Sequence, residues 1–314
     1  MPDWSTSDIP SQVGRRAVIT GATGGLGYES ALALAGAGAE VVLTGRNADK
    51  GARALRDIRA RYPNAHVRYE HLDLASLQCI ADFAGSFVRE YNCLDVLINN
   101  AGVMMPPKRQ VTADGFELQF GTNYLGHFAL SAQLLPALTH AQQPRVVNLS
   151  SLAHRRGAIH FNDLQWEQHY NPWASYGQSK LAMLLFAFEL QRRSDASHWG
   201  LMSNAAHPGY ARTDLIANGP GSDGLLQKAA LLLQPLTSQS AAQGALPTLF
   251  AATAPQAKGA AYYGPSGFYE MKGPVAEAFV AARANDKATA ARLWEVSEEL
   301  THVRWPNAVR EERQ

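Results

Sequence analysis

Short apolar runs alternate along the chain with longer stretches in which apolar residues recur at helical spacing. The short runs predict buried strands, at Arg16–Thr20, Glu40–Thr44, Val67–Leu72, Leu94–Asn99, Arg145–Leu149 and Leu201–Ala206. The longer stretches predict helices, at Gly27–Ala37, Asp49–Arg61, Ser76–Tyr91, Phe116–Leu138 and Ala174–Arg193. This alternation predicts an α/β fold with a doubly wound, Rossmann-type parallel sheet of about seven strands and helices on both faces.

The sequence predicts a single domain over residues 1–314, because no Pro/Gly/Ser-rich linker divides the chain. In this interpretation residues 1–12 are an N-terminal tail and residues 264–314 a C-terminal extension. Residues 214–237 contain Gly219-Pro220-Gly221 beside leucine-rich strings. Such a segment is typical of a substrate lid with a glycine hinge, or of an amphipathic helix packed on the body or on a dimer partner.

Composition and charge exclude several classes of function. The formal net charge of +1 and the 46% hydrophobic residues are ordinary for a globular protein, so neither nucleic-acid nor membrane-surface binding is expected. Cys79 and Cys93 lack the spacing of metal ligands, and no His-Glu-x-x-His string occurs, so no metal site is expected. With no signal-peptide pattern and no apolar run of membrane-spanning length in the sequence, the expectation is a cytoplasmic protein without a membrane span.

A glycine-rich turn follows the first predicted strand and opens the first predicted helix. Gly21, Gly25 and Gly27 permit a tight turn and a close approach of the backbone to a pyrophosphate, with Thr23 and Leu26 between them. The helix N-terminus adds amide donors and partial positive charge. The context on both sides therefore favours a dinucleotide cradle over a glycine-rich turn with no ligand.

The end of the second predicted strand indicates the type of nucleotide. A cofactor with a free ribose 2′-hydroxyl usually meets a carboxylate there, but this strand ends in Leu43-Thr44-Gly45-Arg46. A guanidinium can bind a 2′-phosphate through charge-assisted hydrogen bonds, which predicts NADP(H) rather than NAD(H). Alternatively, Arg46 caps the following helix or stays solvated, with Asp49 as a nearby partner.

Tyr176 and Lys180 lie four residues apart in a predicted helix, so their side chains share one face. A cation beside a phenol favours the phenolate, which brings proton exchange nearer neutral pH. Such a pair alone is more often structural. The glycine-rich turn upstream makes a proton donor beside a bound nucleotide the sharper hypothesis.

These features together resemble the short-chain dehydrogenase/reductase family from about Ser11 to Trp305. Within it the chain is most similar to the branch of retinol dehydrogenases and the WW-domain-containing oxidoreductase, with their bacterial relatives. Four further strings at strand ends carry the likeness: Asp73-Leu74, Asn99-Asn100-Ala101-Gly102, Asn148-Leu149-Ser150-Ser151 and Pro208-Gly209-Tyr210-Ala211-Arg212-Thr213.

The resemblance implies how these strings meet the cofactor. Asp73 and Leu74 would hold the adenine. The adenosine ribose would be bordered by Asn100, Ala101 and Gly102. The carboxamide of the nicotinamide would be bound by Thr213, in the string that begins with Pro208 and Gly209.

The resemblance further implies a catalytic tetrad of Asn123, Ser151, Tyr176 and Lys180. Tyr176 would be the acid in reduction and the base in oxidation, while Lys180 would lower its pKa and bind the nicotinamide ribose. Ser151 would hydrogen-bond the substrate oxygen; Ser150 is the alternative, because adjacent strand residues face opposite ways. Asn123 would hold a water that relays protons through Lys180, a role that coexists with bridging the backbone inside its helix.

Three features bear on how far the resemblance carries. A polar, aromatic-rich insertion, Leu152–Pro172, separates Ser151 from Tyr176, as in the retinol dehydrogenase branch. Gly21, Gly24 and Gly27 also match the spacing of epimerase and dehydratase relatives, although chain length and the Asn-Asn-Ala-Gly string favour a simple reductase. The mammalian retinol enzymes have a membrane-anchoring N-terminus that this chain is expected to lack, so retinol is not carried over as its substrate.

The predicted function is reversible hydride transfer between NADP(H) and a carbonyl or alcohol of a small molecule. Residues after Ser151, Tyr210 and the segment 214–237 would line the substrate pocket, whose apolar content favours a hydrophobic aldehyde, ketone or secondary alcohol. Three rivals stay open: a same-fold epimerase or dehydratase, a sensor or scaffold that binds NADP(H) without catalysis, and a pathway-specific tailoring reductase with the same chemistry on another substrate. Pairing through the helices Phe116–Leu138 and Ala174–Arg193, as in many family members, implies a homodimer or homotetramer.

Overall fold

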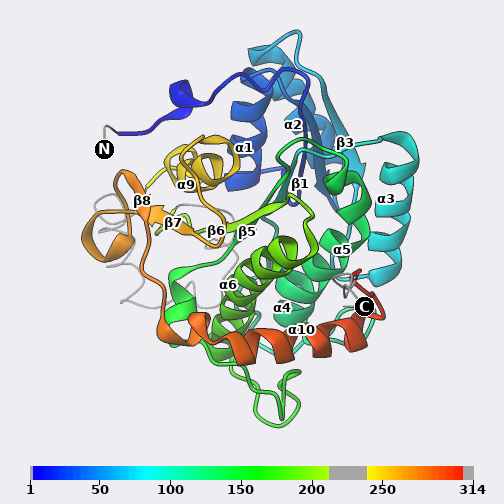
Figure 1. Cartoon of the computed structure of the whole chain (residues 1–314), viewed down its shortest axis with the longest axis vertical. Helices are drawn as coiled ribbons and strands as arrows, with labels where there is room; N and C mark the ends of the chain where they lie inside the picture. The colour runs from blue at the N-terminus through cyan, green and yellow to red at the C-terminus, as the bar shows by residue number, and fades with distance from the viewer. Residues whose placement is uncertain (1–2, 212–238, 307–314) are drawn as a thin grey trace, which may run out of the picture.

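The computed structural model describes residues 3–211 and 239–306. Within these ranges eight strands form one sheet in the order β3-β2-β1-β4-β5-β6-β7-β8 (Figure 1). Neighbouring strands are parallel except β7 and β8, which are antiparallel. The strands are β1 (Arg16–Ile19), β2 (Glu40–Gly45), β3 (Val67–His71), β4 (Val96–Asn99), β5 (Arg145–Leu149), β6 (Met202–Ala206), β7 (Tyr262–Pro265) and β8 (Val275–Glu277). The predicted doubly wound α/β fold is confirmed.

Helices cover both faces of this sheet. The α-helices are α1 (Gly25–Gly36), α2 (Ala48–Arg61), α3 (Leu77–Glu90), α4 (Leu118–Phe120), α5 (Gly126–Thr139), α6 (Pro172–Ser197), α9 (Ala241–Thr253) and α10 (Lys287–Thr301). The shorter helical turns are η1 (Thr6–Asp8), η2 (Gly121–Leu125), η3 (Leu152–Arg156), η4 (Phe268–Glu270) and η5 (Ala282–Asn285). On one face α1 packs against α9 and α2, and on the other lie α3, α5 and α6, with α10 against α6 (Figure 1).

The strand pleat divides the apolar residues between two cores. In β1, Val18 packs among side chains of α3, α5 and α6, whereas Ala17 and Ile19 pack among those of α1, α2 and α9. Successive side chains of a strand point to opposite faces, so a strand covered on both sides is a nearly continuous apolar run. This is why the run of apolar residues located the first strands correctly.

Three elements of the last third of the chain were not predicted. Helix α9 is buried on almost every side and contains Pro247, so it shows no amphipathic period. Strand β7 reads Tyr-Tyr-Gly-Pro, and β8 has only 3 residues. Neither run has the length or the β-branched content that marks a strand in sequence. Each becomes a strand by pairing with its neighbour, β7 with β6 and β8 with β7. These strands bring the sheet to eight rather than about seven.

The predicted helix Phe116–Leu138 is divided into α4, a π-helical turn (η2) and α5. His127, at the start of α5, braces this turn: its Nδ1 lies 2.8 Å from the carbonyl oxygen of Asn123, and its Nε2 lies 2.8 Å from Thr20 Oγ1. A carbonyl oxygen only accepts, so Nδ1 carries the hydrogen and the threonine hydroxyl donates to Nε2. The wider turn thereby presents Asn123 in a geometry that recurs at functional sites.

Helix α10 covers the outside of α5 and α6. The ring of Trp294 lies 5.0 Å from that of Phe128 and 5.8 Å from that of Phe186, centroid to centroid. Trp305 adds contacts to the same two rings at 5.7 and 6.1 Å. These helices are the ones through which pairing was expected, and much of their surface already contacts residues of the same chain. The homodimer or homotetramer stays a prediction.

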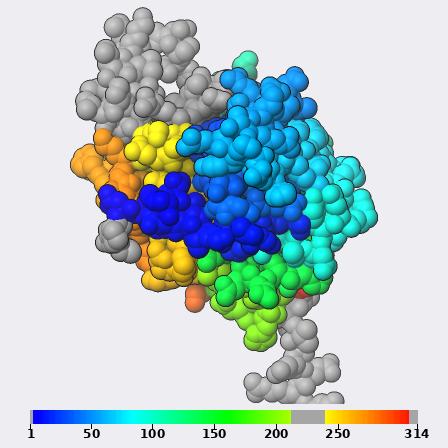
Figure 2. All heavy atoms as spheres, turned by 90° about the horizontal axis from the view of Figure 1, so that it is seen from above, coloured from blue at the N-terminus to red at the C-terminus, as the bar shows by residue number. Residues whose placement is uncertain are grey.

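The N-terminal tail lies on the body of the domain. The rings of Trp4 and Phe250 meet edge to face with centroids 5.4 Å apart, and Gln12 N donates to Ala37 O at 2.8 Å. Figure 2 shows the dark blue N-terminal residues beside the yellow and orange residues of the last third of the chain. The predicted lid, 214–237, lies outside the described residues. In the described part of the chain, no helix combines the length and apolarity needed to cross a bilayer.

Candidate active site

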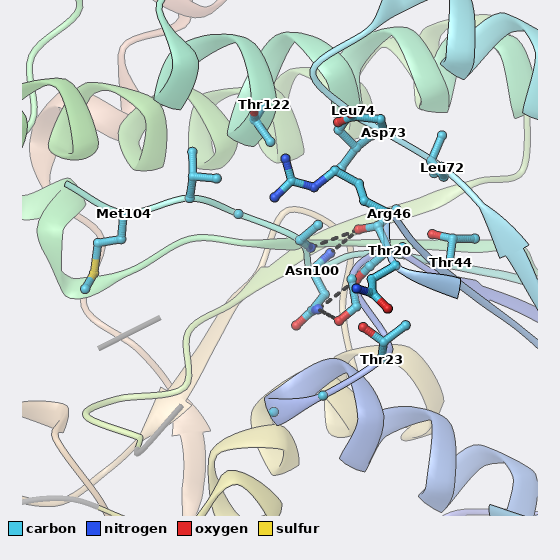
Figure 3. A pocket seen from close by; sticks show the side chains of 18 of the residues that line it. Thr20, Thr23, Thr44, Arg46, Leu72, Asp73, Leu74, Asn100, Met104 and Thr122 are labelled. Carbon is cyan, nitrogen blue, oxygen red and sulfur yellow. Dashed lines mark hydrogen bonds between the residues drawn. The ribbon is translucent and has the colours of Figure 1, made fainter. Parts of the chain in front are cut away.

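A cavity of about 610 Å³ lies beyond the C-terminal ends of β1, β2, β3 and β4 (Figure 3). Between β1 and β4 the strand order reverses: β2 and β3 follow on one side of β1, and β5 and β6 follow on the far side of β4. Ligands of open α/β sheets bind beyond the strand ends at such a point, and the cavity lies there. The predicted cofactor residues that line it are Gly21, Thr23, Gly25, Leu26, Arg46, Asp73, Leu74, Asn100, Ala101 and Gly102. The folded chain therefore brings the cofactor residues of four separate strings to one cavity.

The glycine turn has the conformation that a phosphate cradle requires. Gly21 has φ 64° and Gly25 has φ 54°, in the left-handed region, whereas Gly24 is extended at φ −175°. A Cβ on Gly27 would lie 2.5 Å from Gly21 O and 2.6 Å from Asn100 Nδ2. Gly21, Gly25 and Gly27 are thus the glycines that the backbone needs, which favours the reductase spacing. Helix α1 starts at Gly25 without a side-chain cap, so its first amides suit a pyrophosphate.

Thr20, at the end of β1, ties the glycine turn to the loop after β4. Its hydroxyl oxygen accepts from the backbone N–H groups of Asn100 and Ala101, both at 2.9 Å (Figure 3). Asn100 Nδ2 donates in return to Thr20 O at 2.7 Å. This network fixes the two loops that border the cavity, and the observed glycine geometry fits a bound dinucleotide.

Arg46 reaches into the cavity from the end of β2 (Figure 3). The cap of α2 is Asn47, whose side chain accepts from Lys50 N at 2.9 Å, so the capping alternative for Arg46 is wrong. Within residues 3–211 and 239–306, no carboxylate, Asp49 included, lies within ion-pair distance of Arg46. Lys50, which the sequence analysis missed, also lines this end of the cavity.

Ser151, Tyr176 and Lys180 come together beside the cavity. The Ser151 hydroxyl lies close enough to the Tyr176 phenol to act on its pKa, and Lys180 Nζ lies 5.8 Å from the centroid of the Tyr176 ring. The ammonium also lies 3.7 Å from where a Cβ on Gly102 would be, so it neighbours a residue that lines the cavity. Ser150 faces the other way and donates to Lys180 O at 2.7 Å. The structure thus places Ser151, not Ser150, beside the tyrosine.

Burial dominates the electrostatics of the Tyr176 and Lys180 pair. Burial raises the pKa of Tyr176 to about 12, although the hydrogen bond from Ser151 acts to lower it. Burial lowers the pKa of Lys180 to about 8, so its charge is lost more easily than that of an exposed lysine. Desolvation thus sets the direction of the Tyr176 pKa, and the lowering by Lys180 that the resemblance implied stays a prediction.

Asn123 bridges backbone groups inside the domain. Its Oδ1 accepts from Val103 N at 2.7 Å, and its Nδ2 donates to Val103 O at 3.0 Å and to Ser179 Oγ at 2.9 Å. Both amide hydrogens are therefore engaged. The bridging role is observed, and the water relay through Lys180 stays a prediction.

The loop after β6 holds the last predicted motif. Gly209 has φ 62°, and a Cβ there would collide with Met271 O, so only glycine fits. Tyr210 is 38% exposed, and its backbone N donates to Met271 O at 2.8 Å. The substrate role of Tyr210 stays a prediction, and Thr213 lies outside the described residues. Among the described residues, no group of three His, Cys, Asp or Glu side chains could hold a metal ion.

The family model described as short chain dehydrogenase matches residues 15–220. The chain belongs to the short-chain dehydrogenase family.

Named relatives place this short-chain dehydrogenase near one branch of the family. It is 48% identical to human retinol dehydrogenase 13 over 212 residues, which is 67% of this chain and only 62% of that protein. It is 40% identical to human retinol dehydrogenase 12 over 292 residues, covering 93% of this chain and 88% of that protein. Mouse polyprenol dehydrogenase is 38% identical over 303 residues, with 95% and 87% covered. The likeness to the retinol dehydrogenase branch is confirmed.

Solved structures of this family share the fold. An uncharacterised protein from Mycobacterium paratuberculosis aligns with a TM-score of 0.80 at 40% identity, over 97% of this chain and 99% of that one. A short chain dehydrogenase from Shigella flexneri, complexed with NADP, aligns with a TM-score of 0.62 at 24% identity, over 81% and 97% of the two chains. At that identity the second likeness shows the fold alone.

Two features of this short-chain dehydrogenase were missed in the sequence analysis. Lys50 lies one helical turn beyond Arg46, and a second cation at that spacing was the signal available for it. His127 had no such signal. One of its partners, Thr20, is far away in the sequence, and the other is the backbone oxygen of Asn123, which any residue would supply. Burial lowers the pKa of His127 to about 3, so the imidazole stays neutral and acts as a fixed brace.

Proposed function

We propose that this protein is an NADP(H)-dependent oxidoreductase that interconverts a carbonyl and an alcohol on a hydrophobic small molecule. The observation that carries the proposal is that Ser151 and Lys180 both lie beside the phenol of Tyr176, and that the Lys180 ammonium also lies beside Gly102, which lines the dinucleotide-sized cavity. A phenol, a hydroxyl donor and an ammonium at one cavity wall are suited to proton transfer at a polarised oxygen.

The preference for NADP(H) over NAD(H) is supported by the charges at the adenosine end of the cavity. Arg46 reaches in from β2, Lys50 lies on the first turn of α2, and the N-terminus of α2 adds partial positive charge. Three positive features at one end would stabilise a 2′-phosphate through charge-assisted hydrogen bonds. The residues at hand therefore fit the phosphorylated cofactor.

Each residue of the site has a distinct task in this proposal. Bound NADP(H) would supply or accept the hydride. In the direction of reduction, Tyr176 donates its proton to the carbonyl oxygen while Ser151 donates a hydrogen bond to the same atom. Lys180 stabilises the phenolate that forms, and that stabilisation offsets part of the desolvation that raises the pKa of Tyr176.

The substrate class is proposed from the relatives and the expected apolar pocket. Retinol dehydrogenase 12 and polyprenol dehydrogenase are named for apolar alcohols, which supports a hydrophobic aldehyde, ketone or alcohol here. We further propose that the protein acts in the cytoplasm, where NADPH is available.

The test is NADPH and NADH oxidation, followed by nicotinamide absorbance, across a panel of hydrophobic aldehydes and ketones. Turnover with NADPH that is lost in Tyr176→Phe supports the proposal, and Trp173→Phe, an exposed aromatic on the same helix, serves as the control. Tight NADPH binding without turnover on any carbonyl would favour the epimerase or sensor alternatives. Better turnover with NADH would refute the cofactor preference alone.

A further inference from the structure

Glu270, in the C-terminal extension, joins three segments of the chain through one carboxylate. Its Oε2 lies 2.6 Å from Arg155 Nη2 and 3.1 Å from His207 Nε2. Its Oε1 accepts from Phe279 N at 2.8 Å. The three donors, Arg155, His207 and Phe279, come from three different segments of the chain. Glu270 therefore holds these segments at fixed separations.

Two of the segments held by Glu270 are the loops that follow neighbouring parallel strands. Arg155 lies on η3, which begins directly after Ser151 at the end of β5. His207 follows β6 and precedes Pro208 and Gly209. Because the carboxyl ends of parallel strands share one edge of the sheet, both loops border the region where ligands bind.

Hydrogen-bond geometry fixes the charge states in this network. His207 Nδ1 accepts from Gly209 N at 3.2 Å, so Nε2 carries the hydrogen and donates to Glu270. Burial lowers the pKa of His207, which keeps the imidazole neutral. Partial burial acts to raise the pKa of Glu270, but hydrogen bonds from His207 and Phe279 and the charge of Arg155 lower it overall. Glu270 is thus a carboxylate that receives three donors.

The surrounding backbone is shaped to accept this network. Glu270 and the preceding Tyr269 have φ values of 58° and 49°, in the left-handed region that side chains other than glycine rarely adopt. On β7, a Cβ on Gly264 would collide with the ring of His207. Consecutive strained residues persist where surrounding contacts over-determine them, and such strain clusters at functional sites.

We infer that Glu270 is a positioning residue that holds the Ser151 loop against the Pro208–Gly209 loop, and thereby sets how the substrate oxygen meets the cofactor. The inference rests on the proposed function. His154 extends the link on the Ser151 side, since its Nδ1 donates to Ser151 O at 2.7 Å. The C-terminal extension would then influence catalysis through the single negative charge of Glu270, without contacting the substrate.

The decisive variant is Glu270→Gln. Glutamine is neutral and has one acceptor oxygen, so the ion pair with Arg155 is lost and, whichever way the amide turns, its nitrogen faces a donor, either Phe279 N or the groups of Arg155 and His207, while the side chain keeps its size. Glu277→Gln is the matched control, because Glu277 lies in the same extension and pairs only on the surface, with Lys258 at 2.9 Å. Arg155→Met is the second variant, and it removes one link without placing a new donor in the network.

The readout is the single-turnover rate constant of NADPH oxidation at saturating carbonyl substrate, with protonated and 4-deuterated NADPH. A first-order rate constant is independent of the fraction of folded enzyme, whereas the amplitude measures that fraction. We expect the rate constant to fall at least tenfold in Glu270→Gln, severalfold in Arg155→Met and less than twofold in Glu277→Gln. The rate constant of each slowed variant should be lower with 4-deuterated than with protonated NADPH, as expected when hydride transfer is the slow step.

Three results would overturn the inference. One is a rate constant for Glu270→Gln within twofold of the parent. The second is a loss confined to the amplitude, which would show a purely structural role; if Glu270→Gln does not fold, Arg155→Met decides by the same criterion. The third is a parent protein that binds NADPH but reduces no carbonyl, which would refute the proposed function first and this inference with it.

Discussion

Replacing Lys180 by methionine should stabilise the cofactor-free protein while abolishing its proposed activity. Lys180 is 6% exposed, and burial lowers its pKa from an ordinary 10.5 to about 8. That difference corresponds to about 3 kcal/mol of penalty on the charged form at neutral pH. Methionine removes the penalty but also the hydrogen bond from Nζ to Leu149 O, worth about 1 kcal/mol. The net expectation at pH 7 is about 2 kcal/mol of added stability.

The sign of the pH dependence follows from proton binding in the two states. Between pH 8 and the unfolded pKa of lysine, the unfolded chain binds more protons at this residue than the folded one, so the stability of the parent rises with pH. The penalty should shrink from about 3 kcal/mol at pH 7 to about 1 kcal/mol at pH 10. The advantage of Lys180→Met should therefore disappear over that interval.

The assay is chemical denaturation of parent and variant at pH 7 and pH 10, without cofactor, with midpoints compared at equal slope. Lys287→Met, at an exposed lysine that begins α10, is the control and should change stability by less than about 0.5 kcal/mol. The reasoning is refuted if Lys180→Met is less stable than the parent at pH 7, or if its advantage does not change with pH. Either result would mean that the ammonium is not desolvated in the folded protein.

Three further variants test the site. Arg46→Glu should raise the KM for NADPH about tenfold or more and spare that for NADH, because it puts a carboxylate opposite the 2′-phosphate; Arg53→Glu, on the exposed face of α2, should change neither. Ser151→Ala should lower kcat about 100-fold and cost about 1 kcal/mol of stability, since its hydroxyl also caps η3 by accepting from Ala153 N. Ser150→Ala should cost about 1 kcal/mol as well but keep most activity, since its buried hydroxyl donates to the α6 backbone. His127→Phe should destabilise the protein by about 2–4 kcal/mol and weaken NADPH binding in titrations; unchanged stability would show that the brace is dispensable.

Much of the site was visible in the sequence because it lies in short local strings. Gly21, Gly25 and Gly27 predict a tight turn, because glycine adopts backbone conformations that other residues rarely do. The spacing of Tyr176 and Lys180 alone puts them on one helix face. Doubly covered strands produce apolar runs that need no knowledge of their neighbours. These features are properties of a few consecutive residues, so no tertiary information is required to find them.

Other properties depended on atoms far apart in the chain. The choice of Ser151 over Ser150 follows from how β5 ends beside α6, and the bracing by His127 requires β1 and the π-helical turn to meet. The pKa of Lys180 is set by burial, which the sequence does not state. Strand β7 forms because it pairs with β6, and β8 because it pairs with β7. Glu270 gains its partners only when the C-terminal extension folds back on the loops after β5 and β6. The sequence determined the chemistry that the chain carries, and the tertiary structure decided which groups meet, because desolvation and hydrogen bonding act between neighbours in space.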